Sequence, residues 1–140
     1  MIRDHVKCYM KEQNNNCAEA LLHAADDELG LHLPPESFRL IAGYGGGMGC
    51  EKTCGAICSA LAVLSFLSVG RCAHETEGFR ALCGGCVQRM EQAFGSIDCA
   101  SIKARYRDPE TGCLGVVERA ADVLEDVLVK EGKLPIFQKS

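Results

Sequence analysis

Residues 53–70 of the sequence are TCGAICSALAVLSFLSVG, its one long run without a charged side chain. As an α-helix rising about 1.5 Å per residue, the run would measure roughly 27 Å, near the lower limit for crossing a membrane. It holds three serines, a threonine, an internal glycine and two cysteines, and no aromatic belt flanks it. We therefore expect no membrane span, but a buried apolar helix over about residues 52–69 at the centre of a bundle.

Further helices are predicted on both sides of this segment. Residues 15–30 begin with an asparagine suited to an N-cap and end in a glycine, and residues 113–132 carry a regular apolar stripe. A short helix is expected after Pro35, and another, followed by a polar turn, within residues 97–113. Residues 70–96 are expected to form a loop and then a helix that is interrupted or bounded at Gly84-Gly85. The sequence thus predicts one all-α domain over residues 1–140, a bundle of four to six helices around the 52–69 helix, with an extended tail from residue 133.

Composition limits the classes of function. The formal net charge is −4 and no basic stripe is present, so nucleic acid is not expected as a partner. The N-terminal residues MIRDHVKCYMKEQNNN are too polar for a signal peptide, and we expect a cytoplasmic protein. Ten of the 140 residues are cysteine. A cytosolic chain with so many thiols more often uses them for metal binding or redox chemistry than for structural disulfides.

The glycine-rich segment GYGGGMG, residues 43–49, does not match a nucleotide-binding loop. Glu51 stands where a P-loop requires glycine, and the third glycine of the dinucleotide fingerprint is missing. One interpretation is that the glycines allow tight turns and close helix approach. The other is a cofactor-binding role, in which backbone N–H groups stabilise negative charge on sulfur; it involves Gly45, Gly46, Gly47 and Gly49. Because Cys54 is predicted in the first turn of the central helix, we expect the helix dipole to lower its pKa.

Cys83 and Cys86 form a C-x2-C pair. The two residues could bind a metal as two thiolates, form a small disulfide ring, or only pack at a helix end. The four histidines show no metal-binding spacing and are expected to be surface or structural residues. Cys58 is expected to be a small buried side chain.

Several motifs together resemble a known family. They are NCAEA at residues 16–20, GYGGGMG at 43–49, TCGA at 53–56 and the single cysteines at 99 and 113. This order resembles the C_GCAxxG_C_C family of small cysteine-motif proteins over residues 13–128. The resemblance implies redox activity and four characteristic cysteines, which map onto Cys17, Cys54, Cys99 and Cys113. The family's CGAxxG motif corresponds to CGAICS, where Ser59 replaces the last glycine.

Each of the four cysteines lies near the start of a predicted helix, so we expect them to gather where helix N-termini focus positive potential. Four thiolates hold an iron–sulfur cluster or a tetrahedral zinc, and four thiols can instead form two dithiol/disulfide pairs. Cys83 and Cys86 are a candidate second pair of metal ligands. The leading hypothesis is a redox-active protein that passes electrons or thiol equivalents to an unidentified redox partner protein. Of its two forms, we favour an iron–sulfur cluster over thiol/disulfide exchange. A homodimer is one candidate for the oligomeric state. The alternatives are a zinc-binding or metal-trafficking module without redox turnover, and a structural or partner-binding domain whose cysteines only contribute to packing.

Overall fold

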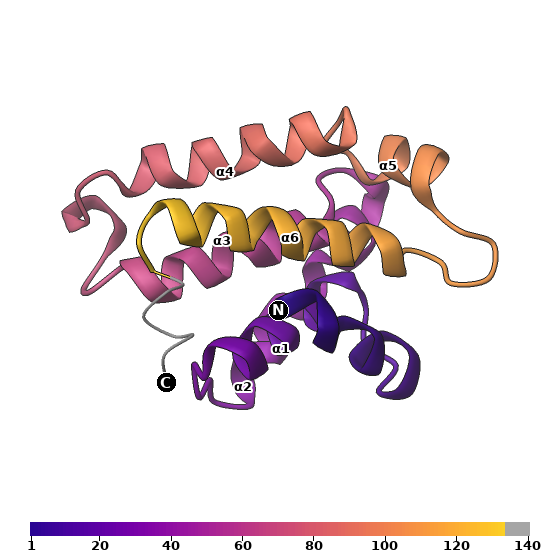
Figure 1. Cartoon of the computed structure of the whole chain (residues 1–140), viewed down its shortest axis with the longest axis horizontal. Coiled ribbons are helices and arrows are strands. Elements are labelled where there is room, and N and C mark those ends of the chain that lie inside the picture. Colours follow the sequence, from indigo (N-terminus) through magenta and orange to yellow (C-terminus); the bar gives the residue numbers. More distant parts are fainter. Residues whose placement is uncertain (134–140) are drawn as a thin grey trace.

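The computed structural model describes residues 1–133, and the tail expected to be extended lies, beyond Lys133, outside the described residues. Within this range the chain forms six α-helices and no β-strand (Figure 1), which confirms the predicted all-α bundle of four to six helices. The helices are α1 (Cys17–Leu29), α2 (Glu36–Ile41), α3 (Gly55–Ser68), α4 (Phe79–Phe94), α5 (Cys99–Tyr106) and α6 (Leu114–Lys130). None of the described helices is long and apolar enough to span a bilayer.

Helix α1 begins and ends where the sequence predicts. The Asn16 side chain accepts a hydrogen bond from the Glu19 N–H at 3.0 Å, and the Asn16 N–H donates to Glu19 Oε1 at 2.9 Å. This reciprocal pair is a capping box, which satisfies two N–H groups that would otherwise lack partners. Gly30 ends the helix in the left-handed conformation with φ +62°.

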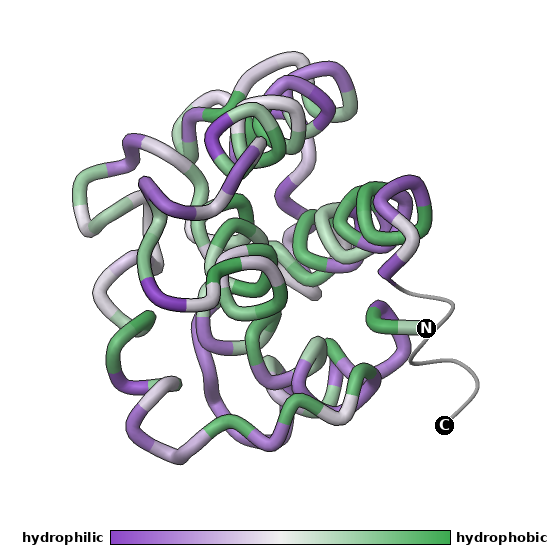
Figure 2. The backbone as a smooth tube through the Cα atoms, turned by 90° about the vertical axis from the view of Figure 1, so that its left-hand side faces the viewer, coloured by the Kyte–Doolittle hydropathy of each residue, from purple (hydrophilic) through white to green (hydrophobic). Residues whose placement is uncertain are grey.

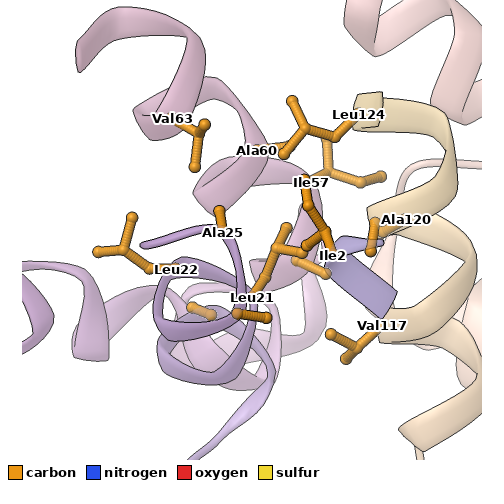
Figure 3. Close-up of a cluster of buried hydrophobic side chains, with 14 of the residues drawn as sticks. Ile2, Leu21, Leu22, Ala25, Ile57, Ala60, Val63, Val117, Ala120 and Leu124 are labelled. Carbon is orange, nitrogen blue, oxygen red and sulfur yellow. The ribbon is translucent and has the colours of Figure 1, made fainter. Parts of the chain in front are cut away.

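Helix α3 is the central helix of the bundle and contacts α1, α4 and α6. Its residues Ile57, Ala60 and Val63 are fully buried, and Figure 3 shows them between side chains of α1 and α6, with Ile2 of the N-terminal segment close to Ile57. Burial is not complete around the helix, because Phe66 on its outer side is 52% exposed. Figure 2 shows several helices nearly end-on, with hydrophobic and hydrophilic residues alternating around their turns.

Helix α4 runs without interruption through Gly84 and Gly85, so the predicted break there is wrong. Each glycine weakens a helix by only about 1 kcal/mol relative to alanine. Cys86, Met90 and Phe94, spaced four residues apart, are buried along one face, and α4 packs against α3 and α6. The free energy of this packing outweighs the unfavourable helix propensity of the two glycines.

The directions of the helices bring several N-termini to one end of the molecule. In Figure 1, α3 and α6 run from right to left, whereas α4 returns from left to right and leads into α5. The starts of α3, α5 and α6 therefore lie at the same end of the bundle.

Candidate functional site

Four cysteines occupy the starts of four helices. Cys17 and Cys99 are the first residues of α1 and α5, and Cys54 and Cys113 are the N-cap residues of α3 and α6. All four line one pocket of about 250 Å³, which we call the four-thiol pocket. The structure therefore brings together side chains that are up to 96 residues apart, from Cys17 to Cys113.

A short backbone pairing places Cys54 beside Cys99. The Cys54 N–H donates to the Ile97 carbonyl at 2.8 Å, and the Cys99 N–H donates to the Lys52 carbonyl at 2.5 Å. These two bonds flank an isolated antiparallel bridge between Thr53 and Asp98. Because each N–H belongs to a residue at a helix start, the pairing both holds two site cysteines and satisfies two end groups of α3 and α5.

A second bridge holds Cys113. Asp108 and Gly112 exchange both backbone hydrogen bonds, at 2.9 and 2.8 Å, and the Asp108 carboxylate accepts the N–H groups of Glu110 and Thr111. These hydrogen bonds lower the pKa of Asp108. The resulting tight turn fixes the residue directly before Cys113.

The glycines around the site leave room for its side chains. A Cβ on Gly47 would lie 2.5 Å from the Cβ of Cys99, and one on Gly55 would lie 2.8 Å from Cys17 Sγ. A Cβ on Gly45 would lie 2.2 Å from Nδ2 of Asn16, whose side chain donates to the Ala42 carbonyl at 2.9 Å. Any larger residue at these positions would displace a site cysteine or the cap of α1.

Among the four glycines predicted to bind a cofactor, only Gly46 lines the four-thiol pocket. Gly45 and Gly47 pack behind it as described above, and Gly49 has open space where a Cβ would be. Gly46, Gly47, Met48 and Gly49 all have positive φ, so the chain makes a left-handed turn here that favours glycine. The structure thus supports the close-packing interpretation of Gly45 and Gly47.

Burial favours the neutral form of three pocket thiols, Cys54, Cys99 and Cys113. Burial raises the pKa of Cys54 from an ordinary 9.0 to about 12, even though the N–H groups of Ala56 and Ile57 at the start of α3 lower it. Burial also raises the pKa of Cys99 and of Cys113. The expectation that the helix start lowers the pKa of Cys54 is therefore wrong, because removal from water outweighs the helix dipole.

Cations lie beside these thiols. Lys103 and Arg107 line the four-thiol pocket, and both lower the pKa of Cys113, as does Lys11. Sequence reasoning missed these residues, although the signal was present: Lys103 and Arg107 follow Cys99 by four and eight residues, on the same face of α5 and its extension.

The four thiols line one pocket, so the kind of metal group that they could hold can be considered. Within residues 1–133, no group of three or more His, Cys, Asp or Glu side chains is placed to hold a single metal ion. A tetrahedral zinc requires four sulfurs about 2.3 Å from the metal, whereas an iron–sulfur cluster takes four cysteines around a larger body. Four thiols that line one pocket are a donor set of the kind that an iron–sulfur cluster takes. All ten cysteines are free thiols.

Cys83 and Cys86 do not join this site. Both lie on α4, and Cys86 faces a different cavity, lined by Val127 and Lys130 near the C-terminal end of α6. That end is roughly 25 Å along the helix from Cys113 at about 1.5 Å per residue. Burial raises the pKa of Cys86 to about 11. The two thiols are therefore separate from the four-thiol pocket.

A family model matches residues 15–127, and its description reads "Putative redox-active protein (C_GCAxxG_C_C)". The chain belongs to the C_GCAxxG_C_C family. The match includes all four pocket cysteines and confirms the resemblance seen in the motifs. No curated protein and no solved structure shows significant similarity to the chain. At the one departure from the motif of this C_GCAxxG_C_C protein, Ser59 is fully buried and its hydroxyl has no hydrogen-bond partner among the described residues.

Proposed function

We propose that the four-thiol pocket is the redox centre of this protein and that its thiols hold an iron–sulfur cluster. The observation that carries the proposal is the gathering of Cys17, Cys54, Cys99 and Cys113 from four separate helix starts around one pocket. Such a cluster supplies reversible one-electron transfer when it is bound.

The electrostatics of the pocket support this proposal. Thiols with raised pKa become ligands only when a positive partner compensates the thiolate, and metal ions do this. The starts of α1, α3, α5 and α6, with Lys103 and Arg107, provide further positive potential around the sulfurs. Four thiolates would therefore be balanced both by the bound group and by the protein.

The protein's own residues keep the sulfurs in place and away from water. The pairing of residues 52–54 with 97–99 holds Cys54 and Cys99, which are only 5% and 7% exposed. The Asn16 cap fixes Cys17 at the start of α1. Backbone hydrogen bonds and a helix cap thus hold the site cysteines in position, which is the support that a preorganised site requires.

Thiol/disulfide exchange is the second candidate function. It is favoured by the position of Cys17, whose charge raises the pKa of Cys54, Cys99 and Cys113 and which therefore lies near all three. In this form the four thiols act as two dithiol pairs, with electrons passed to a redox partner protein.

Oxygen-free purification tests the proposal. We expect iron and acid-labile sulfide in the wild type with visible charge-transfer absorption, loss of all three in Cys54→Ser, and no loss in the matched control Cys83→Ser. Stoichiometric zinc without a redox wave would instead favour the metal-trafficking alternative. A metal-free protein whose thiols oxidise in pairs would refute the cluster and support thiol/disulfide exchange. Thiols that show no defined potential would refute both the cluster and thiol/disulfide exchange.

A further inference from the structure

We propose that Cys58 is a fifth thiol of the site and that Cys17 and Cys58 form a disulfide when the metal-free protein meets a low-molecular-weight disulfide. Cys58 is outside the four cysteines of the family motif and outside the lining of the four-thiol pocket. The disulfide itself does not depend on the iron–sulfur proposal; only its consequence for metal loading does.

The packing of α1 on α3 places Cys17 beside Cys58. Cys17 Sγ lies against the first turn of α3, where a Cβ on Gly55 would be only 2.8 Å away. Cys58 follows Gly55 by three residues and so lies on the same face of α3, one turn later. Helical side chains lean toward the N-terminus, so the thiol of Cys58 leans back toward Gly55 and the sulfur of Cys17.

Charge coupling between the two thiols agrees with this packing. After burial, the charge of Cys17 is the next largest cause of the raised pKa of Cys58, and no other cysteine contributes to it. Such coupling falls with distance, which places the two sulfurs near each other.

Exposure distinguishes Cys58 from the other thiol on this face of α3. Cys54, one turn earlier, is 5% exposed, whereas Cys58 is half-buried. A reagent in water therefore reaches Cys58 more readily than Cys54.

The reaction is a two-step thiol/disulfide exchange. The thiolate of Cys58 attacks one sulfur of the small disulfide R–S–S–R, the S–S bond breaks, and one RSH leaves with the proton of Cys58. Cys17 then attacks the Cys58 sulfur of the mixed disulfide, and the second RSH leaves with the proton of Cys17. The two cysteines lose two electrons and two protons in total, and the small disulfide is reduced to two thiols.

This disulfide would withdraw Cys17 from the four-thiol pocket. Cys17 lies near the other three pocket thiols. When its sulfur is bonded to Cys58, only three thiols remain in the pocket, and these cannot complete a four-cysteine site. A reducing thiol reverses the bond, so loading of the site becomes dependent on the thiol/disulfide balance around the protein.

Peptide mapping tests the disulfide directly. Metal-free protein is treated with oxidised glutathione, remaining thiols are blocked with N-ethylmaleimide, and tryptic peptides are analysed by mass spectrometry. Residues 12–39 contain Cys17 alone, and residues 53–71 contain Cys54 and Cys58. We expect these two peptides to be linked in the wild type and in Cys54→Ser, and the link to be lost in Cys58→Ser. Cys83→Ser, which removes another half-buried thiol, should retain the link.

Three results would overturn the proposal: a link that survives Cys58→Ser but not Cys54→Ser, a link from Cys17 to the peptide of residues 108–119 that contains Cys113, or an unreacted Cys17. If Cys58→Ser does not fold, fragmentation of the wild-type linked peptide assigns the bond. Iron and sulfide content report separately on the cluster, so a protein that forms this disulfide but never binds iron would refute only the proposed function.

Discussion

The substitution Gly55→Ala tests the packing on which the site depends. Replacing glycine by alanine inside a helix normally stabilises a protein by about 0.5–1 kcal/mol. At Gly55, however, the new Cβ would lie 2.6 Å from the Tyr44 carbonyl oxygen and 2.8 Å from Cys17 Sγ. The first of these is a backbone atom that no change of rotamer can move, and such overpacking costs about 1–3 kcal/mol. We therefore expect net destabilisation by about 1–2 kcal/mol, with displacement of Cys17 from the pocket.

Urea denaturation followed by circular dichroism measures this change, with Gly84→Ala as the matched control. Gly84 lies inside α4, whereas Gly55 is the first residue of α3; Gly84 is exposed and has no atom within 4 Å of the position of a Cβ. We expect Gly84→Ala to stabilise the protein by about 0.5–1 kcal/mol. If Gly55→Ala proves as stable as Gly84→Ala, then neither Cys17 nor the Tyr44 carbonyl lies against α3, and the described packing of the site is wrong.

Three further predictions concern single groups. Ser59→Ala should stabilise the protein by about 1 kcal/mol in thermal or urea unfolding, because it removes a buried hydroxyl without a hydrogen-bond partner among the described residues; a loss of stability would reveal a partner. Asn16→Ala should cost about 1–2 kcal/mol, more than an exposed cap, since the side chain also binds the Ala42 carbonyl; a change under half of that would contradict the cap. The pKa of Cys54, about 12 when folded against 9.0 ordinarily, predicts that its stabilising contribution is complete below pH 9 and is lost as the pH rises toward 12. Mass spectrometry of iodoacetamide labelling in metal-free protein should accordingly show Cys54 reacting later than the exposed Cys8 at every pH below 9, and equal rates would contradict its burial.

Local signals in the sequence were sufficient for the helices and for the positions of the cysteines along them. The Asn16 cap, the Gly30 stop and the uncharged run of residues 53–70 each act within a few turns, so they can be recognised without knowledge of the fold. The same signals place Cys17 and Cys54 at helix starts. The family motif adds Cys99 and Cys113 to this group.

Contacts between distant segments decided how the cysteines meet, in which direction the pKa of Cys54 shifts, and that α4 is continuous. The pairing of residues 52–54 with 97–99 and the packing of Cys17 Sγ against Gly55 join parts of the chain that no local pattern connects. The direction of the pKa shift of Cys54 depends on how much water the folded chain removes, which spacing and helix position do not specify. For the same reason, the continuity of α4 through Gly84 and the separation of Cys86 from the pocket follow from burial against α6. Helix propensity is a property of neighbours in sequence, whereas desolvation and the meeting of thiols are properties of neighbours in space.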